Sequence, residues 1–164
     1  MSLEQAIITW IHLVSAAVWV GGSLFLGAVL APLLKKMSMS LEERIQMMVQ
    51  VGRRFNKIAV PSLIILIVTG LYSSQQVLIN PDSILSTSYG SFLLVKIILV
   101  VALIIAFLVH VRIIRKDVEQ KIISKEMTEQ QIQKLRKKII ILGEIIVIIS
   151  VAVLFFAALL DAGV

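Results

Sequence analysis

The sequence predicts an all-α integral membrane protein, a four-helix bundle that forms one domain. Its 164 residues are 59% hydrophobic, and their mean hydropathy is +0.99. A soluble fold of this length could not cover so much apolar surface. Four apolar segments, about 6–34, 58–79, 91–114 and 139–160, each reach the roughly 20 residues that a helix needs to cross hydrocarbon. Unpaired strand edges cannot face lipid, so we expect all four segments to be helices.

The basic residues predict the orientation of the bundle. All 16 Lys and Arg residues except Lys96 lie in or beside the first and third connections between the spans. Basic residues near helix ends stay on the cytoplasmic side, so we expect these connections in the cytoplasm and both termini outside the plasma membrane. The net charge of +6 then predicts contact with anionic lipids of the inner leaflet, and not with nucleic acid.

The two basic connections also carry signals for helix starts. Ser40 with Glu43, and Thr128 with Gln131, fit capping boxes, so the second and fourth helices should begin well before their apolar segments. Pro61, early in the second segment, predicts a bend there. The chain has no cysteine, which excludes disulfides and Cys-ligated zinc.

Four ionisable residues lie inside the predicted spans: His12, Lys96, His110 and Glu144. A charge inside a membrane helix costs a few kcal/mol, so such residues are candidates for function. His12 is about six residues into the first span and Lys96 about five residues into the third, which runs in the same direction, so we expect them at one depth near the outer surface. His110 and Glu144 lie roughly 20 Å deeper, too far for His12 and His110 to hold one haem between them.

Residues around these two pairs complete two candidate sites. Ser15, Trp19 and Gly22 share a helix face with His12, and this mostly small face leaves room for a planar ligand. Tyr72 and Tyr89 should lie at the same outer end, whereas Arg53 and Arg54 should lie beside His110 and Glu144 at the inner end. Simpler alternatives are that Lys96 reaches out to the headgroups, that His12 only packs, and that Glu144 pairs with His110 or a basic neighbour.

Three stretches carry a family resemblance. HLVSAAVWVGGSLFLGAVLAP, RRFNKIAVPSLIILIVTGLYSS and YGSFLLVKIILVVALIIAFLVHVR resemble the membrane domain of the copper-resistance protein D (CopD) family over residues 12 to 112. That family shows a His before W-x-G-G, an Arg-Phe leading to T-G-L, and Y-G followed by L-L-x-K. The chain is more distantly similar to HemJ-type protoporphyrinogen oxidases, four-helix membrane proteins that hold a b-type haem through a His and a Lys. His12, Lys96 and the stretch from Arg53 and Arg54 to Pro61 match that pattern, and His110 matches it loosely. Residues Ala31 to Lys35, however, stand where HemJ-type proteins have an Arg and a Tyr-His.

These resemblances and the equal depth of His12 and Lys96 lead to the functional expectation. We expect a haem b near the outer surface, with His12 as axial ligand of its iron and Lys96 as second ligand or propionate partner. The pocket would include Ser15, Trp19, Gly22, Tyr72 and Tyr89, and His110, Glu144, Arg53 and Arg54 would form a secondary inner site. The protein would then be a haem-dependent membrane oxidoreductase with a quinone or redox-protein partner.

Three alternatives stay open at this point. One is copper transport or resistance, which the closer family implies, although the chain has no Cys and few soft ligands along the spans. Another is a non-catalytic subunit of a membrane complex or homo-oligomer. The last is an enzyme of haem biosynthesis.

Overall fold

Four long helices make up the protein in a computed structural model that describes residues 2–79 and 87–163, without the side chains of 76–78. The first helix runs from Leu3 to Lys36 as α1 (Leu3–Ala16), η1 (Ala17–Gly21), α2 (Gly22–Leu24), η2 (Phe25–Leu30) and α3 (Ala31–Lys36). The others are α4 (Leu41–Ile79), α6 (Ser88–Ile113) with the short α7 (Lys116–Ile123), and α8 (Glu129–Ala162). Within the described residues there is no strand, and four helices are long and apolar enough to cross a membrane, which confirms the predicted fold class.

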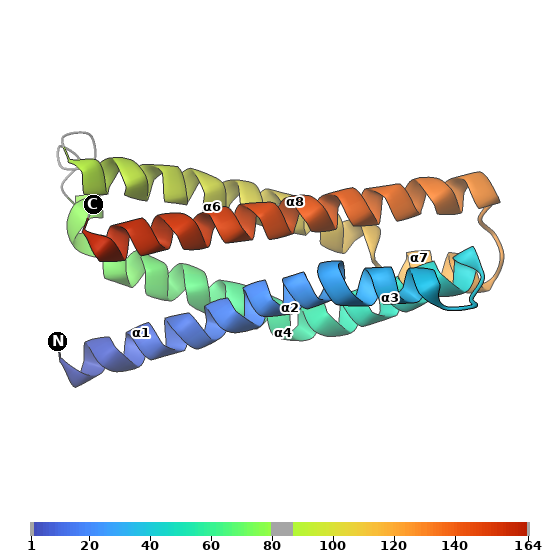
Figure 1. Ribbon diagram of the computed structural model, residues 1–164, viewed down its shortest axis with the longest axis horizontal. Helices are drawn as coiled ribbons and strands as arrows, with labels where there is room; N and C mark the ends of the chain where they lie inside the picture. Colours follow the sequence, from blue (N-terminus) through green and yellow to red (C-terminus); the bar gives the residue numbers. More distant parts are fainter. Residues whose placement is uncertain (1, 80–86, 164) are drawn as a thin grey trace.

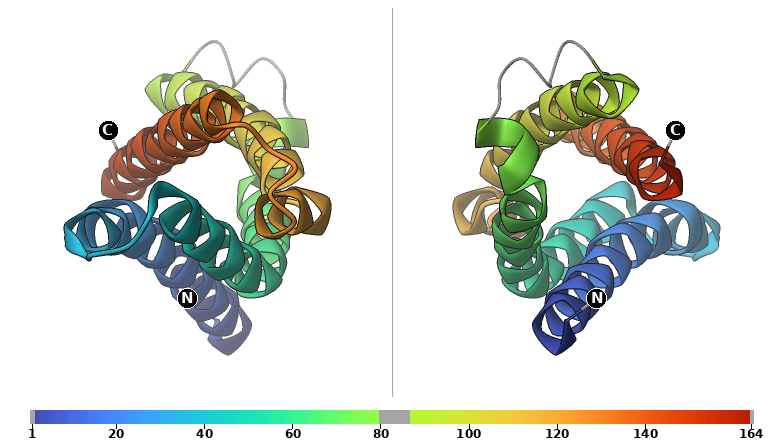
Figure 2. Two further views of the ribbon diagram at one scale, coloured as in Figure 1. Left: turned by 90° about the vertical axis from the view of Figure 1, so that its right-hand side faces the viewer. Right: turned by 90° about the vertical axis from the view of Figure 1, so that its left-hand side faces the viewer.

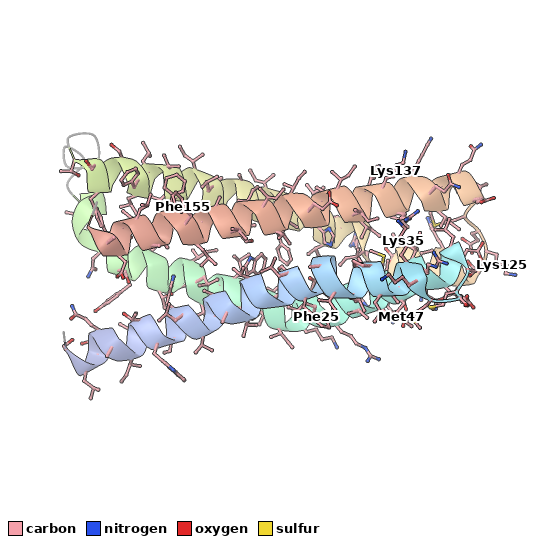
Figure 3. All side chains as sticks on the ribbon, viewed as in Figure 1. Phe25, Lys35, Met47, Lys125, Lys137 and Phe155 are labelled. Atoms are coloured by element: carbon pink, nitrogen blue, oxygen red, sulfur yellow. The ribbon has the colours of Figure 1, made fainter. Side chains whose placement is uncertain are left out.

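The helices form two pairs, α1 with α4 and α6 with α8 (Figures 1 and 2). Both termini lie at one end of the bundle, and the connections before α4 and around α7 lie at the opposite end. Lys35, Lys125 and Lys137 all lie at this connection end (Figure 3). The basic residues therefore gather at one end of the molecule, as the charge pattern predicts. That this end faces the cytoplasm stays a prediction.

Side-chain caps start the helices where the sequence predicts. The Ser40 backbone N–H donates to Glu43 Oε2 at 2.7 Å and the Glu43 N–H donates to Ser40 Oγ at 3.2 Å, which closes the first predicted capping box. Thr128 and Gln131 form the second in the same way. The second and fourth helices therefore begin well outside their apolar segments, at Leu41 and Glu129, and α4 continues through Pro61 as one helix.

Most apolar side chains of the spans face outward, as lipid requires. Only 17–22% of the most apolar window of each long helix is buried inside the protein. The interior holds two separate clusters. The central cluster lies mid-bundle, and the connection-end cluster lies beside α7; their buried members are Trp19, Val20, Ala59, Leu63, Leu103, Phe107 and Ile146, and then Ile45, Val49, Ile114, Ile122, Ile132, Leu135 and Ile139.

The first helix departs from regular α-helical geometry in its middle. η1 and η2 are π-helical, and wide turns of this kind often occur at functional sites. Between them lies Gly22, where a side chain would overlap the ring of Phe55 on α4. The Gly of W-x-G-G and the Phe of Arg-Phe therefore meet in a close approach of two helices. Gly21, the preceding residue, has open space around its Cα.

This contact predicts opposite effects for two neighbouring substitutions. Gly22→Ala should lower the free energy of unfolding by about 1–3 kcal/mol, because its methyl group overpacks against Phe55. Gly21→Ala is the matched control and should be neutral or stabilising, since alanine favours a helix by about 1 kcal/mol over glycine. Thermal melting in detergent, followed by circular dichroism, measures both. Phe55→Leu should restore part of the stability lost in Gly22→Ala; equal effects at both glycines would contradict the contact.

Candidate functional site

The cavity near the termini end contains the two residues that were predicted to pair. His12 from α1 and Lys96 from α6 both line a cavity of about 270 Å³ between the helices, here called the His12 cavity. Both side chains are half-buried. Equal depth along two spans was the basis for expecting them together, and in the structure they also point to a common space.

A hydrogen bond across two helices fixes the His12 ring. Its Nδ1 lies 2.6 Å from Oγ1 of Thr69 on α4. The Thr69 hydroxyl is also 2.6 Å from the Ile65 carbonyl oxygen, to which it donates. Thr69 Oγ1 then accepts from His12, so the proton is on Nδ1 and Nε2 keeps its lone pair. A ring oriented in this way through one nitrogen, with the other free, is the usual arrangement of a metal-binding histidine.

The T-G-L motif, residues 69–71, therefore positions His12. Thr69 orients His12, and Gly70 lies directly beneath the ring, so that a Cβ there would be 3.7 Å from His12 Cε1. Sequence reasoning noted the motif but did not assign Thr69 to the site. A Thr inside an apolar helix usually bonds its own backbone, and nothing in the sequence indicates that this one also reaches a histidine 57 positions earlier.

Lys96 has no acidic neighbour on this cavity. Among the described residues that line it there is no carboxylate, and the remaining wall is almost entirely apolar. The site is thus one imidazole nitrogen and one amine in apolar surroundings. Such a site can hold a metal ion through His12, but a protonated Lys96 would repel that ion.

The other residues expected at this site lie elsewhere, with one exception. Tyr72 donates to Glu4 Oε1 at 3.2 Å on the exposed surface, and Tyr89 is half-buried at the start of α6. Ser15 is buried in α1, and Gly22 lies against Phe55. None of these four lines the His12 cavity, whereas Trp19 does.

Trp19 separates the His12 cavity from a second one. Its indole Nε1–H donates to Ser150 Oγ on α8 at 3.0 Å, and Ser150 donates to the Ile146 carbonyl oxygen at 2.7 Å. The indole also packs edge-on against Phe107 on α6, with ring centroids 4.9 Å apart. Within the described chain Trp19 is the one residue that lines both cavities. It is therefore the partition between them.

The second cavity, here called the His110 cavity, lies toward the connection end and measures about 430 Å³. His110 and Glu144, which were predicted to lie together, both line it, along with Met48 and Asn56. His110 is half-buried and Glu144 is exposed.

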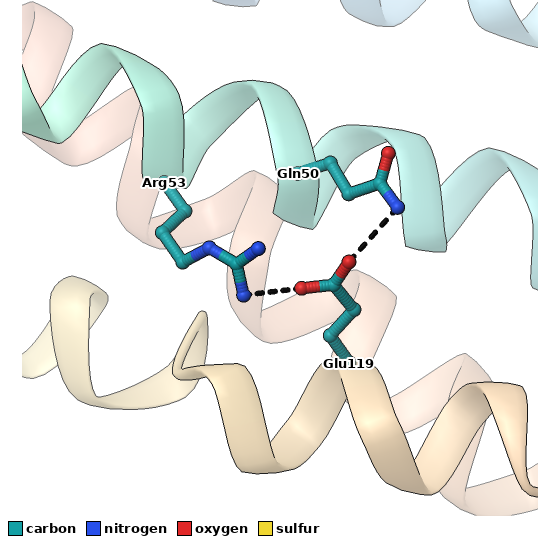
Figure 4. Close-up of polar contacts among 3 residues, drawn as sticks. All are labelled: Gln50, Arg53 and Glu119. Atoms are coloured by element: carbon teal, nitrogen blue, oxygen red, sulfur yellow. Dashed lines mark hydrogen bonds and ion pairs between the residues drawn. The ribbon is translucent and has the colours of Figure 1, made fainter.

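The two arginines expected beside His110 do not line its cavity. Arg53 instead forms an ion pair with Glu119 of α7, and Gln50 Nε2 donates to the same carboxylate at 2.8 Å (Figure 4). Arg54 is exposed. Glu119 was not singled out from the sequence, because it lies in a charged segment between spans where a buried carboxylate has no sequence signal. This cluster fastens α7 to α4.

The His12 cavity has side-chain donors that could bind haem iron, but it is too small for a haem. A free imidazole nitrogen and an amine are possible axial ligands. The cavity of about 270 Å³, however, is below the roughly 300–1,000 Å³ of pockets that hold drug-sized molecules, and a porphyrin is at least that large. No arginine lines the described wall to receive propionates. The structure therefore does not fit the predicted haem.

Comparison with known proteins identifies the family. The family model described as Copper resistance protein D matches residues 49–160. The chain belongs to this copper-resistance family. The match includes Thr69 and Lys96, and it begins after His12. An uncharacterized protein of Aquifex aeolicus (strain VF5) is 34% identical over 99 residues, which are 60% of this chain and 67% of that one. No solved structure matches.

The described side chains form no ready metal cluster. No group of three or more His, Cys, Asp or Glu residues that could hold an ion occurs among the described residues. His12 is thus the one imidazole donor on the described wall of its cavity. The likeness to HemJ-type proteins stays a prediction.

The partition can be tested by a double-mutant cycle between Trp19 and Ser150. Trp19→Phe keeps most of the ring but loses the N–H, and Ser150→Ala loses the acceptor. Each change should lower the free energy of unfolding by about 1 kcal/mol or more, with a coupling energy of about 0.5–1.5 kcal/mol between them. Chemical or thermal unfolding in detergent measures all four proteins. Strictly additive losses would contradict a direct bond.

Proposed function

We propose that this copper-resistance family member carries copper through the membrane, with His12 as a transient ligand inside the bundle. The observation that carries the proposal is the His12 ring itself, which Thr69 holds at Nδ1 while Nε2 stays free beside an internal cavity. Imidazole nitrogen is a good copper ligand. The family match supports copper over other metals.

A single donor suits an ion that must leave again. Sites along a conduction path have to bind strongly enough for entry and weakly enough for release. Three or four strong ligands would trap copper, whereas His12 alone gives a short-lived complex. The half-buried Lys96 on the same wall lowers the affinity further by repulsion when it is protonated.

Trp19 would then control passage. An ion in the His12 cavity meets the indole before it reaches the His110 cavity. Its path continues only when the bond to Ser150 opens and the ring turns. Met48 and His110 on the far side offer a thioether and a second imidazole, both suited to Cu(I). The wide turns of η1, which carries Trp19, supply a segment of the helix that can rearrange.

Uptake of Cu(I) into proteoliposomes that contain the purified chain tests the proposal. His12→Ala should reduce uptake to the level of empty liposomes. Thr69→Val should lower copper affinity about 10- to 100-fold, because the ring loses its orienting partner. Thr69→Ser is the matched control, since it keeps the hydroxyl, and it should behave like the natural protein.

The same preparations discriminate copper from haem. Wild-type uptake no faster than that of empty liposomes would contradict the proposal. A Soret band in the purified protein that disappears in His12→Ala would show that His12 binds haem and not copper. Normal uptake in His12→Ala, with only a lowered melting temperature, would make His12 a packing residue.

Lys96 provides a second test, in which removing a polar side chain from the cavity should raise the affinity for copper. Lys96→Met should raise the affinity for Cu(I) about tenfold, because two positive charges on the order of 10 Å apart repel by roughly 1.5 kcal/mol at an effective dielectric constant of about 20. Lys96→Arg keeps the charge and should leave the affinity within about twofold. Competition with a Cu(I) chelator of known affinity measures both. A loss of binding in Lys96→Met would instead make Lys96 a ligand.

A further inference from the structure

The His110 cavity is built for something larger than an ion. Its volume of about 430 Å³ is within the roughly 300–1,000 Å³ range of small-molecule pockets, whereas one copper ion would leave most of it empty. The wall is predominantly apolar, with few polar side chains, among them His110, Asn56 and Glu144. A mostly apolar cavity between helices with a few polar groups is the common form of a ligand site.

His110 offers a hydrogen-bond donor to this space. Its Nδ1 is fully buried and has no hydrogen-bond partner among the described residues. A proton on Nδ1 would therefore be buried and unpaired, so the neutral ring carries its proton on Nε2. Since His110 lines the cavity, Nε2–H is the donor that a ligand can meet. The matching group on the ligand is a carbonyl oxygen.

The charges of the wall restrict the ligand further. No Lys or Arg lines the cavity within the described chain, so nothing there would neutralise a phosphate or a carboxylate. The carboxyl group of Glu144, which also lines the cavity, would not favour an anion. A phospholipid headgroup, a nucleotide and a haem with its propionates are all disfavoured. The ligand is therefore neutral.

The cavity opens sideways toward lipid. Leu24 on the first helix and Ile148 on α8 line it and are also exposed on the outer surface of the bundle. Small residues, Gly27 and Ala28 on the first helix and Gly143 on α8, also line the cavity and leave space in it. A molecule dissolved in the bilayer can enter without crossing water.

From these observations we propose that the His110 cavity binds a lipid-soluble quinone, whose carbonyl accepts a hydrogen bond from His110 Nε2. A quinone is neutral, apolar and rich in carbonyl oxygen, and its home is the bilayer. The proposal does not rest on copper binding at His12, because His12 and His110 line different cavities.

Trp19 provides the readout. The chain has two tryptophans, so Trp10→Phe leaves the cavity-lining Trp19 as the sole indole fluorophore. Decylubiquinone, a short-chain quinone, is titrated into this variant of the full chain in lipid nanodiscs. A bound quinone should quench Trp19 to a saturating level, above the linear quenching caused by quinone that is merely dissolved in the lipid.

A cavity-filling variant locates the site. A Cβ at Gly143 meets no atom within 4 Å, so Gly143→Leu should fill the space without a clash and should not lower the melting temperature. It should abolish saturable quenching. Gly21→Leu is the matched control: Gly21 also has free space but lines neither cavity, and binding should persist. Gly27→Leu fills the cavity from the opposite wall and serves if Gly143→Leu does not fold. His110→Leu should weaken binding about fivefold.

Several results would overturn the proposal. Purely linear quenching in the parent protein would mean no site, and saturable quenching that persists in both filled variants would place the quinone elsewhere. Quenching by brominated phosphatidylcholine that decylubiquinone fails to displace would assign the cavity to a lipid chain. Copper that binds there with dependence on His110 and Met48, while quinone does not, would make it a metal site. Copper affinity measured on Gly143→Leu by chelator competition separates this proposal from copper binding at His12, since His12 lines the other cavity and only quinone binding should be lost.

Discussion

The position of the Trp19 indole is the constraint on which both cavities depend. The side chain leaves a wide turn of the first helix, donates to Ser150 on α8 and packs edge-on against Phe107 on α6. One residue thereby ties one helix pair to the other at mid-bundle. Less than one turn later, Gly22 lets Phe55 bring α4 against the same helix. The cavity on each side of the indole exists because these contacts position the helices around it.

Most of the fold was predictable because its determinants are local. Apolar length indicated the spans, and Ser40 and Thr128 indicated helix starts that the structure confirms. The wide turns of η1 and η2 were not predictable, since hydropathy gives no signal for one extra residue per turn. Gly22 follows η1 and does not line the His12 cavity, so the face counted forward from His12 does not continue as a stripe. Gly22 consequently meets Phe55 and not a ligand pocket.

The sequence predicts how deep the site residues lie along their helices, but not which way each helix is turned about its axis. A rise of 1.5 Å per residue and a common direction suffice to bring His12 and Lys96 to one level, and both line one cavity. Which side chain of α4 faces His12 depends on the rotation of that helix about its axis, which a single sequence does not give. Thr69 and Ser150 were missed for this reason, as each looks like a hydroxyl that bonds its own helix. Tyr72 was placed at the correct end, yet it faces Glu4 at the surface.

The connection-end cluster is a second core, which we expect to be surrounded by water, whereas the central cluster should be surrounded by lipid. α4 has 39 residues, about 58 Å at 1.5 Å per residue, whereas the hydrocarbon layer is about 30 Å thick. Ile45, Val49, Ile122 and Ile132 lie outside the four apolar segments of the sequence, so we expect water to compete for them and lipid to compete for the central cluster. Only the transfer of apolar side chains between water and the protein interior carries a large heat-capacity change and responds to urea. We therefore expect the protein's sensitivity to cold and to urea to come mainly from the connection-end cluster.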